Sequence, residues 1–249
     1  AFRPADVLID RELLTDSFRY TVPTVTSPLP LDVRSIRPPR PMTERVLAVN
    51  ENGHAMVPSD QFNLPDGPIT VECWFKADRY SNRTGLIAKT ENSEHGIFVN
   101  RGVPAFSIHL DGRYVQVSSP EALGTNQWHH VAGVFDGEQV RLYIDGRLVD
   151  SEPGSGTRST NDFPFMVGAD VDRSGRPTSY FNGQIDEVRL SKVARYTSEA
   201  FQPARRFESD DDTVLLLNMD GSLGPWLFDS SPSGAQPRMG GRAALSNAN

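Results

Sequence analysis

The loop at residues 168–175 has the side-chain types and spacing of a cation site. Its side-chain oxygens fall at alternate positions, on Asp170, Asp172 and Ser174, and Gly175 follows. This order matches the first half of an EF-hand calcium loop, but the closing Glu is missing because Phe181 stands there. An EF-hand is therefore excluded. The loop is either a calcium site with two carboxylates or an acidic turn in which Asp side chains bind the backbone.

A second acidic stretch lies at Asp186 and Glu187. Neighbouring residues of a strand point to opposite faces, so this spacing predicts one carboxylate on each face rather than a catalytic pair. The sequence has no nucleophile elbow, phosphate loop or His-x-x-x-His zinc motif. We therefore expect no catalytic residue and no enzyme activity.

Composition excludes several classes of partner. The 249 residues carry a net charge of −7, which argues against nucleic acid, since a phosphate backbone requires a basic surface. No apolar run approaches the roughly 18 residues that a membrane span needs. Cys73 is the single cysteine, so the chain can form no internal disulfide, and its strand context predicts a buried side chain.

The elements that must position these loops are β-strands. Residues 69–76 alternate apolar and polar side chains, and three Asp-Gly pairs separate short apolar runs. Asp-Gly is typical of tight hairpins because both turn residues tolerate positive φ. Nothing indicates helices alternating with strands, so the sequence predicts an all-β antiparallel fold. The expected strands are 69–76, 85–89, 96–100, 105–110, 114–118, 131–135, 140–144, 148–150 and 213–217.

The chain divides into three parts by composition. Residues 1–41 form a Pro-rich N-terminal extension or strap, in which proline favours extended segments. Residues 42–219 contain the predicted sandwich. Residues 220–249 are a Gly/Ser/Pro-rich C-terminal tail, and this composition predicts a loop or linker. We therefore expect a domain of a longer multidomain chain.

Four segments resemble laminin G-like domains of the concanavalin A-like lectin/glucanase superfamily. They are residues 45–58, 69–75, 126–149 and 181–190, in the family's order. The resemblance implies a two-sheet antiparallel β-sandwich, or jelly roll, over residues 42–219. It does not specify function, because this fold carries lectins, pentraxins, adhesion modules and hydrolases. Hydrolases of this shape take their carboxylate pair from a Glu-x-Asp-x-Glu strand. Gln184 stands at the nucleophile position here.

The resemblance to pentraxins bears on the loop at residues 168–175. It implies that Asp170 and Asp172 match an acidic calcium-binding pair, with Glu94 as a further ligand. His95 departs from that family's Asp-Asn pair, and Ser179 stands near the place of its glutamine ligand. These departures favour a single calcium ion over a double site.

The leading hypothesis is therefore a non-catalytic carbohydrate- or glycoprotein-binding module in a secreted, cell-surface or periplasmic protein. Calcium is its candidate cofactor. Candidate ligand-binding residues are Glu94, Tyr114 and Tyr180, because aromatic rings beside polar groups suit sugar faces. Each ring could instead pack a loop against the core. The alternatives are a protein-interaction or architectural domain of a larger extracellular protein, and a glycoside hydrolase or lyase with a carboxylate pair drawn from distant strands.

Overall fold

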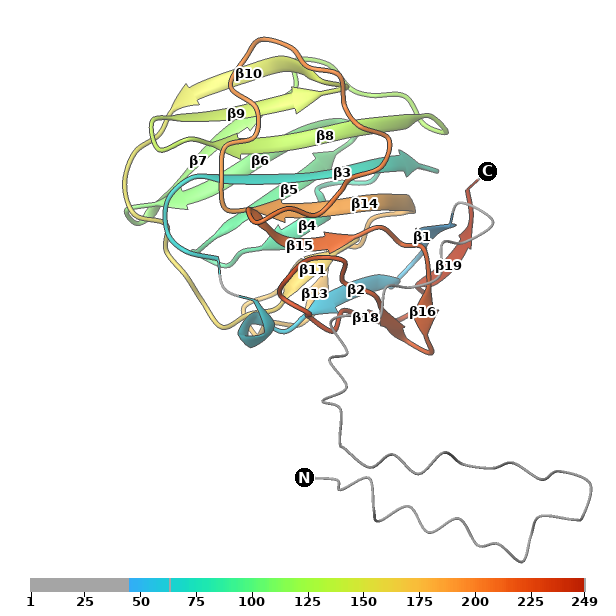
Figure 1. The fold of residues 1–249 in the computed structure, drawn as a ribbon. Helices are drawn as coiled ribbons and strands as arrows, with labels where there is room; N and C mark the ends of the chain where they lie inside the picture. Colours follow the sequence, from blue (N-terminus) through green and yellow to red (C-terminus); the bar gives the residue numbers. More distant parts are fainter. Residues whose placement is uncertain (1–44, 63, 249) are drawn as a thin grey trace, which may run out of the picture. The chain divides into compact units, whose positions relative to one another are not determined.

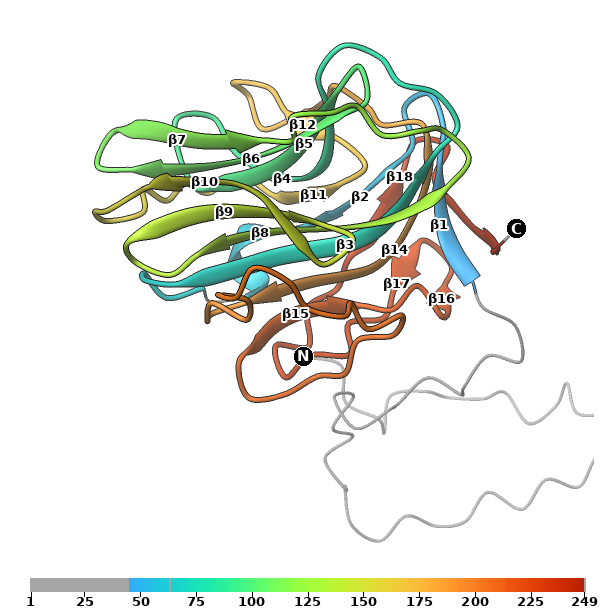
Figure 2. The same ribbon diagram turned by 90° about the horizontal axis from the view of Figure 1, so that it is seen from above.

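Two antiparallel β-sheets lie face to face in the computed structural model, which describes residues 45–62 and 64–248 (Figure 1). The view from above shows the two layers separately (Figure 2). The prediction of an all-β sandwich is confirmed. The predicted Pro-rich extension, residues 1–41, lies outside the described residues.

One sheet has eight strands in the order β10-β9-β8-β3-β14-β1-β19, with β15 also pairing with β14. Every pairing in this sheet is antiparallel. The strands are β1 (Arg45–Val49), β3 (Ile69–Ala77), β8 (Trp128–Phe135), β9 (Gln139–Ile144), β10 (Arg147–Pro153), β14 (Gly183–Ser191), β15 (Thr213–Leu217) and β19 (Ala244–Asn247).

The other sheet has nine strands in the order β16-β17-β18-β2-β11-β4-β5-β6-β7. They are β2 (His54–Val57), β4 (Thr84–Lys89), β5 (His95–Asn100), β6 (Val103–Leu110), β7 (Arg113–Ser118), β11 (Phe165–Val167), β16 (Ser222–Leu223), β17 (Trp226–Leu227) and β18 (Arg238–Gly240). A separate two-stranded ribbon pairs β12 (Asp170–Val171) with β13 (Pro177–Thr178).

The C-terminal residues are built into both sheets, which differs from the loop-like tail that their composition predicted. β18 pairs with β2 in the nine-stranded sheet, and β19 pairs with β1 in the eight-stranded sheet. Short strands rich in Gly, Ser and Pro carry little of the apolar alternation by which strands are recognised, so their pairing was missed.

The core lies between the sheets and follows the two-residue period of the strands. In β3, Ile69, Val71, Cys73 and Phe75 are fully buried and belong to the main apolar cluster. The predicted burial of Cys73 is confirmed. In the described part of the chain the helical structure is a 3-10 turn at Ser59–Gln61, and no helix is long and apolar enough to span a membrane.

The Asp-Gly pairs form the predicted hairpins. Asp111-Gly112 joins β6 to β7 with φ of 45° and 85°, and Asp145-Gly146 joins β9 to β10 with φ of 50° and 78°. Positive φ at both residues is the geometry that matches strand twist in a two-residue turn. The third pair lies in the connection from β8 to β9, where Gly137 alone has positive φ, at 102°.

A segment without regular structure, residues 192–212, covers the outer face of the eight-stranded sheet. Its Tyr196 and Phe201 rings stack at 3.6 Å and pack against Tyr143 of β9, which is fully buried. The Tyr143 hydroxyl donates to the Ser198 carbonyl at 3.0 Å. On the outer face of the nine-stranded sheet, by contrast, a pocket is open.

Substitution of Gly133 tests the packing between the sheets. A Cβ at Gly133 in β8 would lie 2.2 Å from the Phe106 ring of the opposite sheet. We expect Gly133→Ala to lower the free energy of unfolding by about 1–3 kcal/mol, as overpacked cores do. Urea denaturation followed by fluorescence measures this. Gly124→Ala is the control, because its Cβ would meet only ordinary contacts at 3.7 Å. Equal losses in the two variants would contradict the expectation.

Candidate functional site

A pocket of about 230 Å³ opens on the outer face of the nine-stranded sheet, over β5, β6 and β7. Strand alternation places its sheet residues opposite the core positions Ile97, Phe106 and Val117. The pocket combines aromatic rings, amides, hydroxyls and two charged groups. Its lining residues are Arg83, Thr90, Glu91, Asn92, Phe98, Ser107, Tyr114 and Gln116.

The floor of the pocket is the Phe98 ring, and its position depends on Gly96. A Cβ at Gly96 would lie 2.6 Å from the Phe98 ring, so the ring lies over a position where only glycine fits. The Arg83 guanidinium covers the ring at 3.7 Å from its centroid. Phe98 is therefore only 4% exposed, whereas the Arg83 side chain is 52% exposed.

The sheet side of the pocket is polar. Ser107 of β6 lies opposite Gln116 of β7, and the Ser107 hydroxyl donates to Gln116 Oε1 at 2.9 Å. Tyr114 lies opposite His109, with the two rings edge to face at 4.7 Å. The Tyr114 hydroxyl donates to the Ser93 carbonyl at 3.0 Å. The amide of Gln116, which is exposed, can therefore meet a ligand, while the Tyr114 hydroxyl holds the rim.

Asp170, one of the predicted calcium ligands, joins two walls of this pocket from behind. Its carboxylate lies 2.6 Å from the Arg83 guanidinium and accepts a hydrogen bond of 2.6 Å from Thr90 Oγ1. A third bond comes from the Val171 amide at 2.9 Å. Asp170 is 3% exposed. A buried carboxylate needs such partners, so Asp170 fixes both Arg83 and Thr90 in place.

The rim of the pocket is a strained loop. Glu91, Asn92 and Glu94 have φ of 76°, 56° and 54°, a region that side chains seldom occupy. Hydrogen bonds to the chain around Ser159 hold it, because the Glu94 amide donates to the Ser159 carbonyl at 2.8 Å and Ser93 Oγ donates to the same oxygen at 3.0 Å. The loop is thus preorganised around Glu91 and Asn92, the residues that it presents to the pocket.

Glu94, predicted as a metal and ligand-binding residue, lies behind this rim and not in the pocket. It is 4% exposed and lies 3.1 Å from Arg158 Nε and 3.6 Å from Lys89 Nζ. Burial by itself would raise its pKa, but the adjacent His95 and these two cations lower the pKa below its ordinary value. Arg158 also donates to the Pro65 carbonyl at 2.8 Å. Glu94 therefore anchors the loop.

Asp172 and Tyr180 lie apart from the pocket lining. Asp172 Oδ1 accepts hydrogen bonds from the amides of Ser174 and Arg176 at 2.7 and 3.0 Å, which is an Asx-type turn. The Tyr180 hydroxyl donates to the Pro177 carbonyl at 2.8 Å. Across residues 45–62 and 64–248, no three His, Cys, Asp or Glu side chains group so as to hold a metal. Asp170, Asp172 and Glu94 are therefore not gathered into one group in this arrangement, and calcium stays a prediction.

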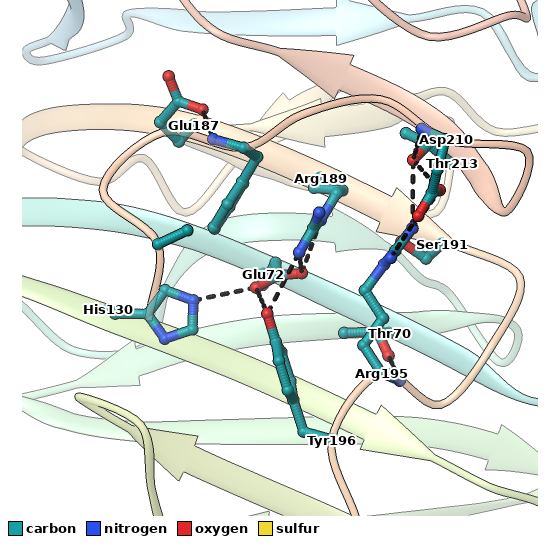
Figure 3. A network of polar contacts seen from close by, with 12 residues as sticks. Thr70, Glu72, His130, Glu187, Arg189, Ser191, Arg195, Tyr196, Asp210 and Thr213 are labelled. Atoms are coloured by element: carbon teal, nitrogen blue, oxygen red, sulfur yellow. Dashed lines mark hydrogen bonds and ion pairs between the residues drawn. The ribbon is translucent and has the colours of Figure 1, made fainter. Parts of the chain in front are cut away.

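A second polar network lies on the opposite side of the molecule, beneath residues 192–212 (Figure 3). Glu72 of β3 is fully buried and lies 3.0 Å from His130 Nε2 and 2.7 Å from an Arg189 nitrogen. The Tyr196 hydroxyl donates to the same carboxylate at 2.9 Å. Burial raises the pKa of Glu72, but the His130 hydrogen bond and the Arg189 charge outweigh it and lower the pKa. This enclosed network ties the covering segment to the sheet.

His129 and His130 are adjacent residues of β8 and point to opposite faces of the strand. His130 contacts Glu72 on the outer face, while the His129 ring lies 6.0 Å from the core residue Phe75. The two rings therefore cannot share one metal ion.

The prediction that Asp186 and Glu187 point to opposite faces is wrong. The pairing of β14 with β3 shifts register between Asp186 and Arg189, and Glu187 has φ of 51°. This β-bulge turns both carboxylates into one small pocket of about 30 Å³, which strand alternation alone could not reveal. The other lining residues are Arg45, Arg205, Arg206, Asn218 and Asp220.

The pKa values of both carboxyls in this pair are raised above their ordinary values. Burial and the neighbouring Glu187 raise the pKa of Asp186 to about 8. Burial raises the pKa of Glu187 to about 7, against hydrogen bonds from the Phe207 amide and the Asn218 side chain. Their pocket is too small for a sugar ring and is lined by arginines, so we assign it a structural role.

Of the predicted ligand-binding residues, only Tyr114 lines the larger pocket. Sequence reasoning missed Arg83, Phe98, Ser107 and Gln116. A signal existed for the strand residues, because Ser107 alternates with the apolar Phe106 and Ile108. No local pattern marks Arg83, which reaches the pocket through its contact with Asp170, 87 positions away.

Comparisons with known proteins agree with this architecture. Residues 50–200 match the family model of the concanavalin A-like lectin/glucanases superfamily. The human laminin subunit alpha-3 is 29% identical over 145 residues, which cover 55% of this chain and 4% of that protein.

Among solved structures, a proposed carbohydrate-binding protein from Bacteroides ovatus superposes with a TM-score of 0.64 at 17% identity. The match covers 83% of this chain and 60% of that chain. At this identity it shows the fold alone. Domains LG4-5 of the mouse laminin alpha1 chain match with a TM-score of 0.49 at 17% identity, over 66% of this chain and 48% of that one.

The acid pair gives a pH-dependent prediction. Asp186 has a higher pKa in the folded than in the unfolded chain, so the folded state binds more protons between about pH 4 and pH 8. Its contribution to stability is present below this window and is lost as pH rises through the folded pKa. We expect Asp186→Asn to gain about 1–3 kcal/mol in unfolding free energy relative to wild type between pH 5 and pH 9.

Urea denaturation at both pH values measures this difference. Asp211→Asn is the control, since Asp211 is exposed. A difference between Asp186→Asn and wild type that stays constant with pH would contradict the assignment.

Proposed function

Because the chain belongs to the concanavalin A-like lectin/glucanases superfamily, we propose that it is a non-catalytic carbohydrate-binding module whose ligand occupies the pocket on the nine-stranded sheet. The observation that carries this proposal is the pocket itself, which combines the partly exposed Tyr114 ring, the exposed Gln116 amide and a fixed rim. Sugar sites need this combination, since rings present apolar faces and hydroxyls need donors and acceptors.

The distribution of carboxylates supports binding rather than hydrolysis. Glu91 is the one acidic residue that lines the pocket, and Asp170 behind it is held by Arg83 and Thr90. Hydrolysis by the usual mechanism needs two carboxyl groups on either side of the scissile bond. A glycoside hydrolase or lyase is therefore the less favoured reading of this pocket.

The relatives suggest a setting for the module. The laminin subunit is a far longer chain, of which this sequence matches 4%. We propose that this domain likewise belongs to a larger secreted, cell-surface or periplasmic protein, with a glycan or glycoprotein as its ligand. No nucleic acid partner is proposed, because the net charge is −7.

A protein-interaction role is a second candidate, favoured by one exposed feature. Leu223 and Trp226 face each other across the β16–β17 hairpin and are 74% and 42% exposed. Large exposed apolar side chains at a sheet edge are typical of contact surfaces. The Arg238 guanidinium lies 5.6 Å from the Trp226 ring.

The proposal includes a calcium ion that assists binding, with Asp170, Asp172 and Glu94 as its ligands. Asp170 and Glu94 already have cationic partners, Arg83 and Arg158. A calcium ion would therefore compete with a guanidinium at each carboxylate.

Loss of the exposed amide tests the proposed sugar site. A glycan array identifies a bound sugar, and calorimetry then gives its Kd. We expect Gln116→Ala to weaken binding about tenfold, because one hydrogen bond is lost. Gln127→Ala, in an exposed loop outside the pocket lining, is the control. An array on which no sugar binds would remove the proposal and leave the protein-interaction role.

Thermal melting tests the calcium prediction. An ion that binds the folded state raises Tm by mass action, so the prediction expects a higher Tm in millimolar calcium than in EDTA. The variant Asp172→Asn removes one predicted ligand and should reduce the increase in Tm that calcium causes. Equal melting temperatures of the wild-type protein in the two buffers would eliminate calcium.

A further inference from the structure

The charges around the pocket bear on whether its ligand is an acidic or an uncharged sugar. This inference rests on the proposed carbohydrate function. Two of the eight lining residues carry charge, Arg83 and Glu91. Whether an acidic or an uncharged sugar is accepted depends on which of these charges remains uncompensated.

The charge of Arg83 is already compensated. Its guanidinium lies 2.6 Å from Asp170, whose side chain is 4% exposed. Movement of Arg83 toward a ligand carboxylate would leave this buried carboxylate without its cation, which is strongly unfavourable. Arg83 therefore remains in place over Phe98, and the donors that do not face Asp170 are left to bind neutral oxygens.

The charge of Glu91 is not compensated in the same way. Within the described residues, Glu91 has no ion pair, and its position at the rim is imposed by the backbone, with φ of 76°. The pKa of the neighbouring Tyr114 is raised, first by burial and in smaller part by the negative charges of Asp170 and Glu91. Of the two charged residues in the lining, Glu91 is therefore the one whose charge has no ion-pair partner among the described residues.

The remaining polar groups suit hydroxyls. Asn92 and Gln116 each offer a donor and an acceptor, and Ser107 adds a hydroxyl. Adjacent hydroxyls of a sugar ring can donate to Glu91 and accept from Arg83, whereas a carboxylate can only accept. A uronic or sialic acid would also bring its charge close to Glu91, and like charges repel.

We infer that the pocket takes an uncharged, hydroxyl-rich sugar ring and discriminates against acidic sugars, and that Glu91 is the residue that sets this preference. Arg83 acts as a neutralised donor in this arrangement and not as an anion receptor.

The test compares matched pairs of oligosaccharides that differ in one carboxyl group, such as glucose and glucuronic acid oligomers and galactose and galacturonic acid oligomers. Kd values come from calorimetry at low and at high salt. We expect the neutral member to bind about tenfold more tightly at low salt, with a smaller ratio at high salt as charges are screened. Glu91→Gln should bring the ratio toward one. Glu138→Gln, which changes an exposed acid in the connection between β8 and β9, should leave the ratio unchanged.

Tighter binding of the acidic member by the wild-type protein would overturn the inference, as would a ratio unaffected by Glu91→Gln. In both cases sugar binding itself stands. If no member of any pair binds and the array is also empty, the carbohydrate function fails and this inference fails with it.

Discussion

A buried carboxylate must find cationic or hydrogen-bonding partners, and this requirement organises the irregular segments of the molecule. Glu72 binds Tyr196 and thereby the segment that covers the eight-stranded sheet. Glu94 binds Arg158, which in turn holds the chain near Pro65. Asp170 binds Arg83 and the loop that begins at Thr90. Regular strands satisfy their own backbone groups, so the loops depend on these acids.

The pocket follows from two of these attachments. Asp170 positions Arg83 over the Phe98 ring, and Glu94 holds the rim loop from the inside. The strained φ values at Glu91 and Asn92 persist because the surrounding hydrogen bonds over-determine the loop. Asp170 and Glu94, which were predicted as metal ligands, thus hold the wall and the rim of the pocket, with the counter-charge supplied by arginine.

The two outer faces of the sandwich differ in how far they are covered. Residues 192–212 cover the eight-stranded sheet with the stacked rings of Tyr196 and Phe201, and the acids beneath them are enclosed. On the nine-stranded sheet, polar residues such as Gln116 remain exposed. This asymmetry places the larger pocket on the face of the nine-stranded sheet and the enclosed polar network on the face of the other sheet.

The sequence by itself determined the strand order along the chain, two of the positive-φ Asp-Gly turns and the alternation that buries Cys73, because these depend on neighbours within a few residues. It also carried the family resemblance. Only the tertiary structure decided that a bulge turns Asp186 and Glu187 to one side and that Asp170 faces Arg83. The physical reason is distance along the chain: a pocket is made where strands far apart in sequence are brought together, and local patterns carry no record of those contacts.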